Sequence, residues 1–367
     1  MSELTLMIPG PTWVRPEVLE HCNQLPWGHR DTENTPLRIA PAKKYLKQML
    51  CIEDTEYDVI ISTSSGAGLL EAAIINCVLP DEKVLNVSVG AFGDLWYKIV
   101  KSNGRDSEYL TFDPGTHADP AAIKDALEKD KFAAVCVTMN ETSTGVENPI
   151  AEIGKIVKDA GALYFVDAVS CMAGVPIKAQ EWSIDMVVAS SQKAFGLPPG
   201  ISVAGISPAA FAKAEQNPCR GAYFDLLSFR KSIVKDQTPN TPATNLIDAL
   251  AFQLDYIVNT EGIENRYARH KKLAGIVREW IPTLGGDFSL LPDPAYASNT
   301  ITCVKHAEDL DKAAIKQELR TRGYLYDAGY RALAKKGLHT FRVPTLGDIT
   351  ESMLQTYLQT LTEVLAK

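Results

Sequence analysis

One lysine stands in a segment whose composition could make its amine reactive. Lys193 follows the apolar run 186–189 and the polar residues 190–192, and a breaker cluster of Gly and Pro occupies 196–200. A lysine held on a stiff, partly buried turn has a lowered pKa, because desolvation disfavours the charged amine. Such an amine can condense with an aldehyde. For this segment taken alone, the alternative is an ordinary surface lysine in a loop.

A carboxylate ends another apolar run. Asp167 closes the segment 164–167, and a carboxylate at the tip of an apolar strand is costly unless a cationic or hydrogen-bonding group meets it. A helix N-cap is the alternative interpretation. We expect no metal there, because no partner carboxylates or histidines occur at ligand spacing.

Two further stretches of small polar residues could bind a ligand. Residues 62–68, Ser-Thr-Ser-Ser-Gly-Ala-Gly, precede an apolar helix and could hold an anion on free backbone N–H groups, although no Walker-type Gly-Lys-Ser/Thr follows. A tight turn with a serine N-cap is the alternative. In the segment 139–145, the hydroxyl of Thr142 could reach a ligand, and an Asx or ST turn fits the same composition.

All four stretches follow predicted strands. The pattern predicts strands at 57–61, 83–89, 107–112, 132–139, 162–167, 184–189 and 201–206, with helices at 69–79, 92–102, 119–129 and 149–159. Strands that are apolar on both faces and alternate with helices predict an α/β fold with a mostly parallel seven-stranded sheet covered by helices. Ligands bind beyond the carboxyl ends of such strands, where these stretches lie.

The rest of the chain predicts a second, smaller unit. Three prolines in 7–16 exclude a helix there, 36–50 reads as a helix, and 207–243 is less regular. Long helical patterns follow at 244–260 and 263–281, and then strands at 299–304, 324–326 and 339–343 and helices at 309–322 and 349–366. We therefore expect an N-terminal arm (1–13) that packs on the small domain or a partner subunit, a large α/β domain (14–255) and a small α+β C-terminal domain (256–367).

Composition narrows the class of protein. The chain has 367 residues, 46% of them hydrophobic, and a net charge of −8 without a basic block, so we expect no nucleic-acid partner. Its seven cysteines are scattered and form no CxxC pair, which is typical of a reducing compartment. No signal peptide or membrane-spanning run is visible, so we expect a cytoplasmic protein without a membrane partner.

A reactive lysine, a buried carboxylate and a phosphate cradle match what pyridoxal 5′-phosphate (PLP) requires. Together with other motifs, they resemble the class V aminotransferases, and more narrowly the alanine–glyoxylate / serine–pyruvate aminotransferase branch. The motifs are Gly10-Pro11, Ser65-Gly66-Ala67-Gly68, Gly90-Ala91-Phe92-Gly93, Glu141-Thr142-Ser143-Thr144-Gly145, Val166-Asp167-Ala168, Ser191-Gln192-Lys193, Pro198-Pro199-Gly200, Thr238-Pro239-Asn240-Thr241-Pro242 and Phe341-Arg342.

The resemblance implies a fold-type-I PLP-dependent transferase that works as a homodimer with shared active sites. Lys193 would carry the cofactor as an internal aldimine and then move the proton between the substrate Cα and the cofactor, while Asp167 would keep the ring nitrogen protonated. The resemblance implies cofactor contacts by Ser65, Gly66, Ala67 and Gln192 (phosphate), Thr142 (ring hydroxyl), Phe92 (ring face), and Thr238 and Thr241 (phosphate of the other protomer). It implies substrate contacts by Gly10 and Arg342.

The implied reaction is ping-pong transamination between alanine or serine and glyoxylate or pyruvate. Only Arg342 matches a carboxylate-binding motif, although Arg15, Arg30 or Arg38 of the N-terminal region could deliver a second cation. Aspartate, phosphoserine or 2-aminoethylphosphonate is the alternative amino donor. Three competing interpretations are a cysteine desulfurase or lyase, which usually has a histidine where Gln192 stands, a non-enzymatic relative and a nucleotide-binding protein.

Overall fold

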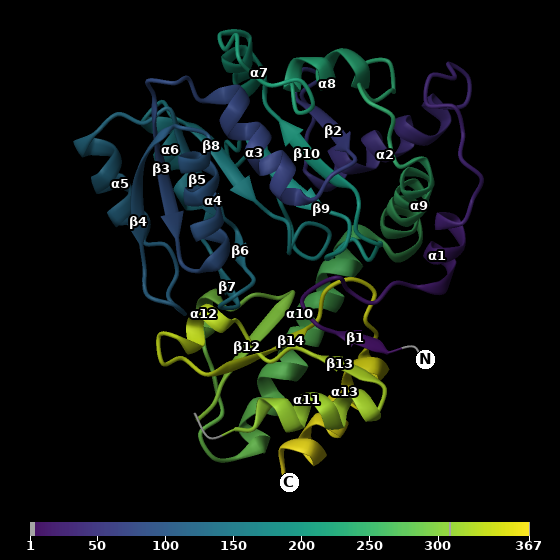
Figure 1. Cartoon of the computed structure of the whole chain (residues 1–367), viewed down its shortest axis with the longest axis vertical. Helices are drawn as coiled ribbons and strands as arrows, with labels where there is room; N and C mark the ends of the chain where they lie inside the picture. The colour runs from purple at the N-terminus through teal and green to yellow at the C-terminus, as the bar shows by residue number, and fades with distance from the viewer. Residues whose placement is uncertain (1–3, 308–309, 367) are drawn as a thin grey trace.

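The structure is a computed structural model that describes residues 4–307 and 310–366. Its largest element is a seven-stranded sheet, in the upper half of Figure 1. The strand order is β2 (Asp58–Ser62), β10 (Ser202–Ile206), β9 (Met186–Ser190), β8 (Leu163–Asp167), β5 (Ala134–Thr138), β3 (Lys83–Ser88) and β4 (Asp106–Thr111). β10 is antiparallel to both neighbours, and the other pairs are parallel. The predicted mostly parallel seven-stranded sheet is confirmed.

Most strands of this sheet are buried along their whole length. Every residue of β2, β5, β9 and β10 is buried, as expected for strands covered on both faces. The prediction that all strands are apolar on both faces is wrong for β4, whose residues are exposed or half-buried. β4 lies at one edge of the sheet, whereas the other edge strand, β2, stays buried because the helices at Pro36–Met49 and Leu226–Ile233 pack against it.

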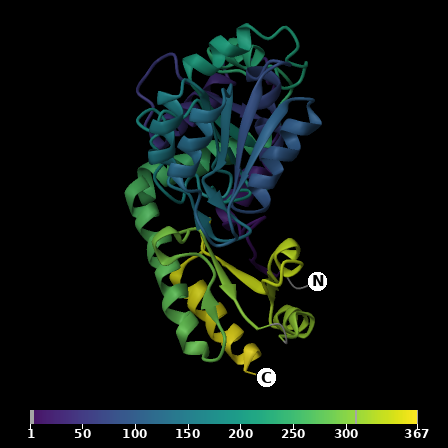
Figure 2. The ribbon, with the colours of Figure 1, turned by 90° about the vertical axis from the view of Figure 1, so that its left-hand side faces the viewer.

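Helices cover the sheet, as the side view of Figure 2 shows. They are α1 (Pro16–Cys22), α2 (Pro36–Met49), α3 (Gly66–Cys77), α4 (Ala91–Ser102), α5 (Pro120–Lys129), α6 (Ile150–Asp159), α7 (Pro208–Glu215), α8 (Leu226–Ile233) and α9 (Thr244–Asp255). The segment 207–243, predicted to be less regular, contains two short helices, α7 and α8, joined by loops. Each has only eight residues, too few for a clear apolar period, but each begins at a side-chain cap, on Ser207 and Asp225.

The predicted helix 244–260 is divided. α9 ends at Asp255, and a π-helical turn follows at Tyr256–Glu261. Gly262, with φ of +83°, then separates this turn from α10 (Ile263–Trp280). Figure 2 shows α10 running from the sheet down along the C-terminal part of the chain.

The C-terminal elements surround a second hydrophobic core. They comprise an antiparallel sheet of β11 (Ser289–Leu290), β12 (Ile301–Lys305) and β14 (Thr340–Pro344), the strand β13 (Tyr324–Tyr326), and α11 (Lys312–Thr321), α12 (Arg331–Ala334) and α13 (Glu351–Leu365). Short 3₁₀ turns lie at Ile281–Leu284 and Pro294–Tyr296, and β6 (Asn140–Glu141) pairs with β7 (Val146–Glu147) beside the large sheet.

The N-terminal segment joins both cores. β1 (Thr5–Met7), which the sequence pattern did not predict, pairs in parallel with β13, and Met7 is fully buried in the second core. Val18 of α1 belongs instead to the core around the large sheet. The division into 1–13, 14–255 and 256–367 stays a proposal, which these two cores support. Within the described ranges, none of the helices has the length and apolarity that crossing a membrane requires.

Candidate active site

Lys193 lies in a tight turn directly after β9. Ser191 Oγ donates to the carbonyl of Pro198 over 2.7 Å, and the amide of Gly196 donates to the carbonyl of Lys193 over 2.9 Å, so hydrogen bonds close the turn. The Nζ of Lys193 donates to the carbonyl of Pro9 over 2.9 Å. The lysine is therefore half-buried beneath the N-terminal segment, not a freely moving surface side chain.

The surroundings of Lys193 favour the neutral amine. Burial, together with the nearby guanidinium of Arg342, lowers its pKa to about 8, while the carboxylates of Asp167 and Asp327 act in the opposite direction. This agrees with the lowered pKa expected from the sequence. It also shows that one cation and two carboxylates lie within electrostatic reach of the amine.

Asp167 ends β8, the strand beside β9. Its side chain is 3% exposed, and Oδ1 accepts the amide N–H of Val169 over 2.8 Å, so it stabilises the turn after the strand and does not cap an α-helix. Burial raises the pKa of Asp167 to about 7, against the lowering effects of the Val169 amide and of Lys193, and the charge of Glu141 contributes to the rise. A bound cation or ring N–H⁺ would favour the ionised carboxylate.

The turn between β2 and α3 places the N-terminus of α3 at the carboxyl ends of the strands, where Asp167 and Lys193 also lie. Ser65 is the N-cap of α3, yet its exposed side chain makes no capping hydrogen bond, so the N-cap alternative does not account for its hydroxyl. A Cβ on Gly66 would lie 2.6 Å from Val169 Cγ2 and 3.5 Å from Ser190 Cβ. The ends of β2, β8 and β9 therefore meet around Gly66.

Two other residues expected at the cofactor phosphate lie beside this turn and the lysine. Ala67, in the first turn of α3, is exposed. Gln192 is partly buried directly before Lys193, and its Oε1 accepts the hydroxyl of Ser190 over 2.7 Å.

Glu141 holds the first turn of α4 in place, a role that the sequence did not predict. Its Oε2 accepts the amides of Phe92 and Gly93 over 2.9 and 3.1 Å, and its Oε1 accepts the amide of Ser143 over 3.0 Å. Burial raises the pKa of Glu141, and these hydrogen bonds lower it. The backbone amide of the partly buried Phe92 is thus held by Glu141, the residue before the buried Thr142.

Arg342, on β14, reaches the large sheet from the C-terminal core. It is 7% exposed, and its Nη1 donates to the carbonyl of Thr142 over 2.9 Å. Its Nε and Nη2 donate to the two carboxylate oxygens of Asp327 over 2.8 and 2.9 Å. The guanidinium lies 5.6 Å from the ring centroid of Tyr330, which is 6.4 Å from the ring of Phe92. Sequence reasoning missed Asp327 and Tyr330.

Thr238 and Thr241 are not brought to Lys193 within the protomer. The hydroxyl of Thr238 donates to the carbonyl of Asn240 over 2.8 Å, and that of Thr241 lies 3.4 Å from His29 Nε2. Across the described residues, neither threonine makes a hydrogen bond to Lys193. Both threonines line one small cavity with Ser62 and Thr63, beside the predicted phosphate turn.

The N-terminal arginines all have partners outside the Arg342 pocket. Arg15 pairs with Asp348 over 3.0 Å, Arg38 pairs with Asp248 over 3.0 Å, and Arg30 donates to the carbonyl of Pro239 over 2.8 Å. Within the protomer, as far as it is described, these three arginines do not supply a second cation beside Arg342.

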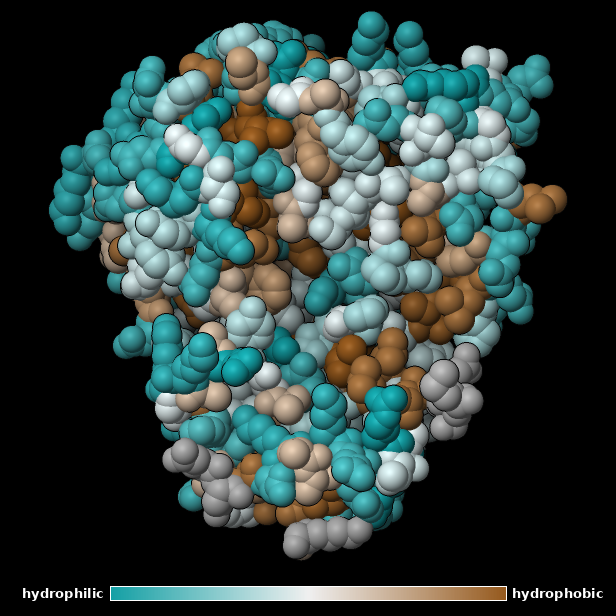
Figure 3. All heavy atoms as spheres, in the orientation of Figure 1, coloured by the Kyte–Doolittle hydropathy of each residue, from teal (hydrophilic) through white to brown (hydrophobic). Residues whose placement is uncertain are grey.

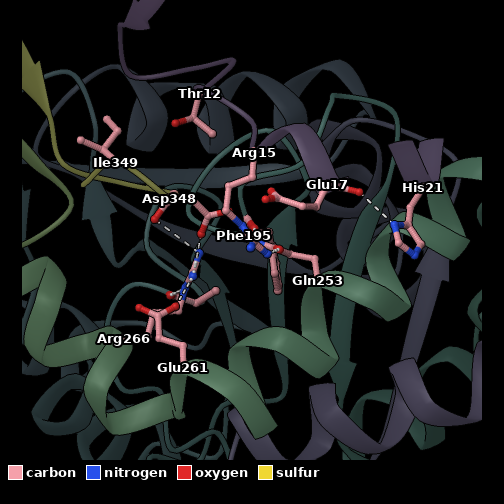
Figure 4. Close-up of polar contacts among 12 residues, drawn as sticks. Thr12, Arg15, Glu17, His21, Phe195, Gln253, Glu261, Arg266, Asp348 and Ile349 are labelled. Atoms are coloured by element: carbon pink, nitrogen blue, oxygen red, sulfur yellow. Dashed lines mark hydrogen bonds and ion pairs between the residues drawn. The ribbon is translucent and has the colours of Figure 1, made fainter. Parts of the chain in front are cut away.

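A buried ion-pair network around Arg266, drawn in Figure 4, contacts the turn that carries Lys193. The fully buried Arg266 donates to Glu261 Oε2 over 2.7 Å and to Asp348 Oδ1 over 2.8 Å. Its Nη2 donates to the carbonyl of Ala194 over 2.7 Å. A buried cation with these partners is well compensated, and it links α10 directly to the residue after Lys193.

The same network holds the N-terminal segment over the lysine. Gln253 donates to the carbonyl of Phe195 over 2.7 Å and accepts Arg15 Nη2 over 2.7 Å, as Figure 4 shows. The amide of Thr12 donates to the carbonyl of Gln192 over 3.1 Å. A Cβ on Gly10, with φ of +149°, would lie 2.6 Å from Lys193 Nζ, so this close approach requires glycine.

Comparison with known proteins assigns the family. The family model described as aminotransferase class-V matches residues 21–342, most of the chain. The chain belongs to the class V aminotransferases. This class V enzyme is thus a PLP-dependent aminotransferase of the fold-type-I architecture, as the resemblance implied.

Several proteins similar to this class V enzyme are named as glyoxylate aminotransferases. It is 32% identical over 360 residues to the serine–glyoxylate aminotransferase of Methylorubrum extorquens, covering 95% of this chain and 88% of the relative. It is 29% identical over 371 residues to the L-aspartate–glyoxylate aminotransferase of Paracoccus denitrificans, covering 100% and 92%. The crystal structure of alanine–glyoxylate aminotransferase from Nostoc sp. matches with a TM-score of 0.91 and 26% identity, covering 100% of this chain and 96% of that chain.

Proposed function

We propose that the enzyme transfers the amino group of alanine or serine to glyoxylate or pyruvate, in a ping-pong reaction with the cofactor attached at Lys193. The observation that carries the proposal is that Asp167 and Lys193 lie at the carboxyl ends of the neighbouring parallel strands β8 and β9, while Arg342 bonds to Thr142 just after β5. In this setting the pKa of Lys193 is lowered to about 8. The amine of Lys193 can react with the aldehyde of the cofactor, the carboxylate of Asp167 can pair with its ring nitrogen, and the guanidinium of Arg342 can bind a substrate carboxylate. Three distant segments of the chain contribute them.

The residues at the sheet edge fit PLP. Gly66 leaves no room for a Cβ and keeps the first N–H groups of α3 accessible, and the hydroxyl of Ser65 is not used for capping. Ser65, Gly66, Ala67 and Gln192 would hold the phosphate. Phe92 and Thr142 would contact the ring and its hydroxyl. The Asp167 carboxylate would hold the proton on the ring nitrogen.

When bound, PLP supplies an aldehyde and an electron-withdrawing ring that stabilises negative charge at the amino acid Cα. Lys193, with a pKa of about 8, can accept and return the proton at that carbon near neutral pH. Arg342 would bind the substrate carboxylate through N–H groups that its protein partners do not use. Gly10 lets the N-terminal segment close over the site, which would exclude water from the reacting atoms.

We propose a homodimer in which each subunit completes the other's site. Within the protomer, Thr238 and Thr241 bond to Asn240 and His29 and not to Lys193, and the resemblance to the family assigns their phosphate contact to a second copy. Two exposed leucines lie in one groove: Leu25 and Leu37, 86% and 69% exposed, line it with Phe252 and with five polar or charged residues, His21, Gln24, Arg38, Asp248 and Asp255. Figure 3 shows apolar side chains at the surface on the side where α1 lies. Exposed apolar patches of this kind mark protein interfaces.

Mixed dimers test the shared site. Thr241→Ala should weaken cofactor retention, and Lys193→Ala should remove activity. In a heterodimer of the two variants, one site combines both defects and the other is intact, so the mixture should be more active than either variant alone. The matched control mixes Lys193→Ala with Asp167→Asn. These two defects belong to one protomer's site, and this mixture should show no recovery. An absence of recovery with Thr241→Ala, in proven heterodimers, would contradict sharing.

A substrate panel tests the reaction itself. Arg342 is the one carboxylate clamp in the pocket of the described protomer, so a distal acid would lose its hydration without gaining a partner. We expect kcat/KM to be higher for alanine and serine than for aspartate, glutamate or 2-aminoethylphosphonate, with glyoxylate or pyruvate preferred over 2-oxoglutarate. The aspartate-using relative makes aspartate the second candidate donor. Preference for a dicarboxylate or the phosphonate would contradict the proposal.

A cytoplasmic location is part of the same proposal. All seven cysteines are free thiols, five of them buried or partly buried, which is the usual state in a reducing compartment. Detection of the protein in the cytoplasmic fraction of its cells would test this assignment.

A further inference from the structure

The guanidinium of Arg342 already carries a carboxylate partner from its own chain. Asp327 accepts Nε with Oδ1 and Nη2 with Oδ2, a two-pronged pairing over 2.8 and 2.9 Å. With the bond from Nη1 to the carbonyl of Thr142, three N–H groups are used, and two of the five remain for a ligand. The site thus presents an arginine whose charge is largely compensated before a substrate binds.

Asp327 is held in this position by its backbone. It follows β13 and forms a bridge to Arg342 in which the amide of Arg342 donates to the carbonyl of Asp327 over 3.3 Å. The amide of Gly329 donates to Asp327 Oδ1 over 3.0 Å. Gly329 itself, at φ of +84°, is pressed against β14, since a Cβ there would lie 2.0 Å from the carbonyl oxygen of Thr340. The carboxylate is therefore a built part of the site and not a loose surface group.

The charge of Asp327 also acts on the amine of Lys193. It raises the pKa of Lys193, against the lowering effects of burial and Arg342. The side chain of Asp327 is 16% exposed, so solvent screens it only in part. The uncharged ring of Tyr330 lies 5.6 Å from the Arg342 guanidinium and 6.4 Å from the ring of Phe92.

We infer that Asp327 is a specificity-determining residue, which restricts the Arg342 pocket to substrates with one carboxylate and an uncharged side chain. The inference rests on the proposed transamination and names the substrate class of that same site. One substrate carboxylate can take the two unused N–H groups of Arg342. A second carboxylate near the guanidinium would meet the fixed charge of Asp327, and like charges brought together are strongly unfavourable.

The test compares the holoenzyme with its Asp327→Asn variant. The amide can still accept the Gly329 amide and one Arg342 N–H, but it carries no charge. We expect the kcat/KM ratio of aspartate to alanine to rise at least about tenfold, chiefly through a lower KM for aspartate. Asp327→Ser, a second uncharged variant, should shift the ratio in the same direction. Asp130→Asn removes a surface carboxylate paired with Lys83 and should leave the ratio unchanged.

A binding measurement keeps the inference separate from the proposed reaction. Calorimetric titration of the wild-type holoenzyme with propionate and succinate should show tighter binding of propionate, and Asp327→Asn should reduce or reverse this preference. Equal or tighter binding of succinate by the wild type would overturn the inference even if no variant folds. An unchanged aspartate-to-alanine ratio in a folded Asp327→Asn protein would also overturn it. Failure of the wild type to transaminate any substrate would overturn the proposed function, while the titration would still report on Asp327.

Discussion

Replacement of Lys193 by alanine is expected to reduce transamination by at least about 10³-fold, because it removes both the attachment point of the cofactor and the group that moves the proton at the substrate Cα. The fold should survive. Across the described residues, the side chain's one hydrogen bond goes to the carbonyl of Pro9, and such a bond contributes about 1 kcal/mol. The measurement is kcat with alanine and glyoxylate, together with the thermal midpoint.

A matched lysine provides the control for this variant. Lys178 is a surface residue paired with Glu181, with 47% of its side chain exposed, so Lys178→Ala should leave kcat unchanged. If Lys193→Ala retains near-wild-type turnover while folded, the assignment of Lys193 is wrong. If both variants lose activity together, the loss reflects general damage and not the chemistry of Lys193.

Asp167→Asn is expected to lower kcat by about 10²- to 10³-fold with little change in structure. Asparagine has nearly the same shape and can still accept the amide of Val169, so the turn after β8 is retained. It lacks the charge that would hold a proton on the ring nitrogen, and that proton matters most when negative charge develops in the transition state. Stopped-flow measurement of a single half-reaction would separate this chemical step from product release.

A second aspartate, the partly buried Asp185, provides a control that separates the chemical role of Asp167 from the general effect of removing an internal carboxylate. Asp185 lies directly before β9, away from the strand ends that carry the site, and accepts the amide of Tyr164 over 2.9 Å and the hydroxyl of Ser207 over 2.6 Å. Asp185→Asn should reduce stability but preserve kcat. Comparable kcat values for Asp167→Asn and wild type would refute the role of Asp167 at the ring nitrogen.

The parts of the site that follow strands were predictable because local pattern decides them. Asp167, Lys193 and the Ser65–Gly66 turn each come at or just after the end of an apolar run, and a parallel sheet brings the carboxyl ends of its strands to one edge. The residue types then indicated the chemistry, since a lysine, a carboxylate and a turn of small residues are what PLP requires. Small errors in the predicted strand boundaries did not matter, because the polar residues themselves mark where each strand stops.

The supporting contacts could not be predicted because they join distant segments. The Asp327–Arg342 pair depends on the path of a three-residue strand and a glycine turn, and the pairing of Arg15 with Asp348 spans 333 positions. Glu141 accepts the amide of Phe92 from 49 positions away, so no local capping pattern reveals it. In each case the charged side chain looks ordinary in the sequence, since its partner is fixed only by tertiary packing.

Peptide mapping of the purified enzyme after borohydride reduction tests the attachment of the cofactor at Lys193. We expect the yellow protein to lose its colour on reduction and mass spectrometry to find one pyridoxyl-phosphate adduct per chain, on Lys193. Prior incubation with alanine alone should release one pyruvate per site and protect Lys193 from labelling, and glyoxylate should restore the labelling. An adduct on another lysine, or none, or continued pyruvate release with ammonia in the absence of an acceptor, would contradict transamination through Lys193.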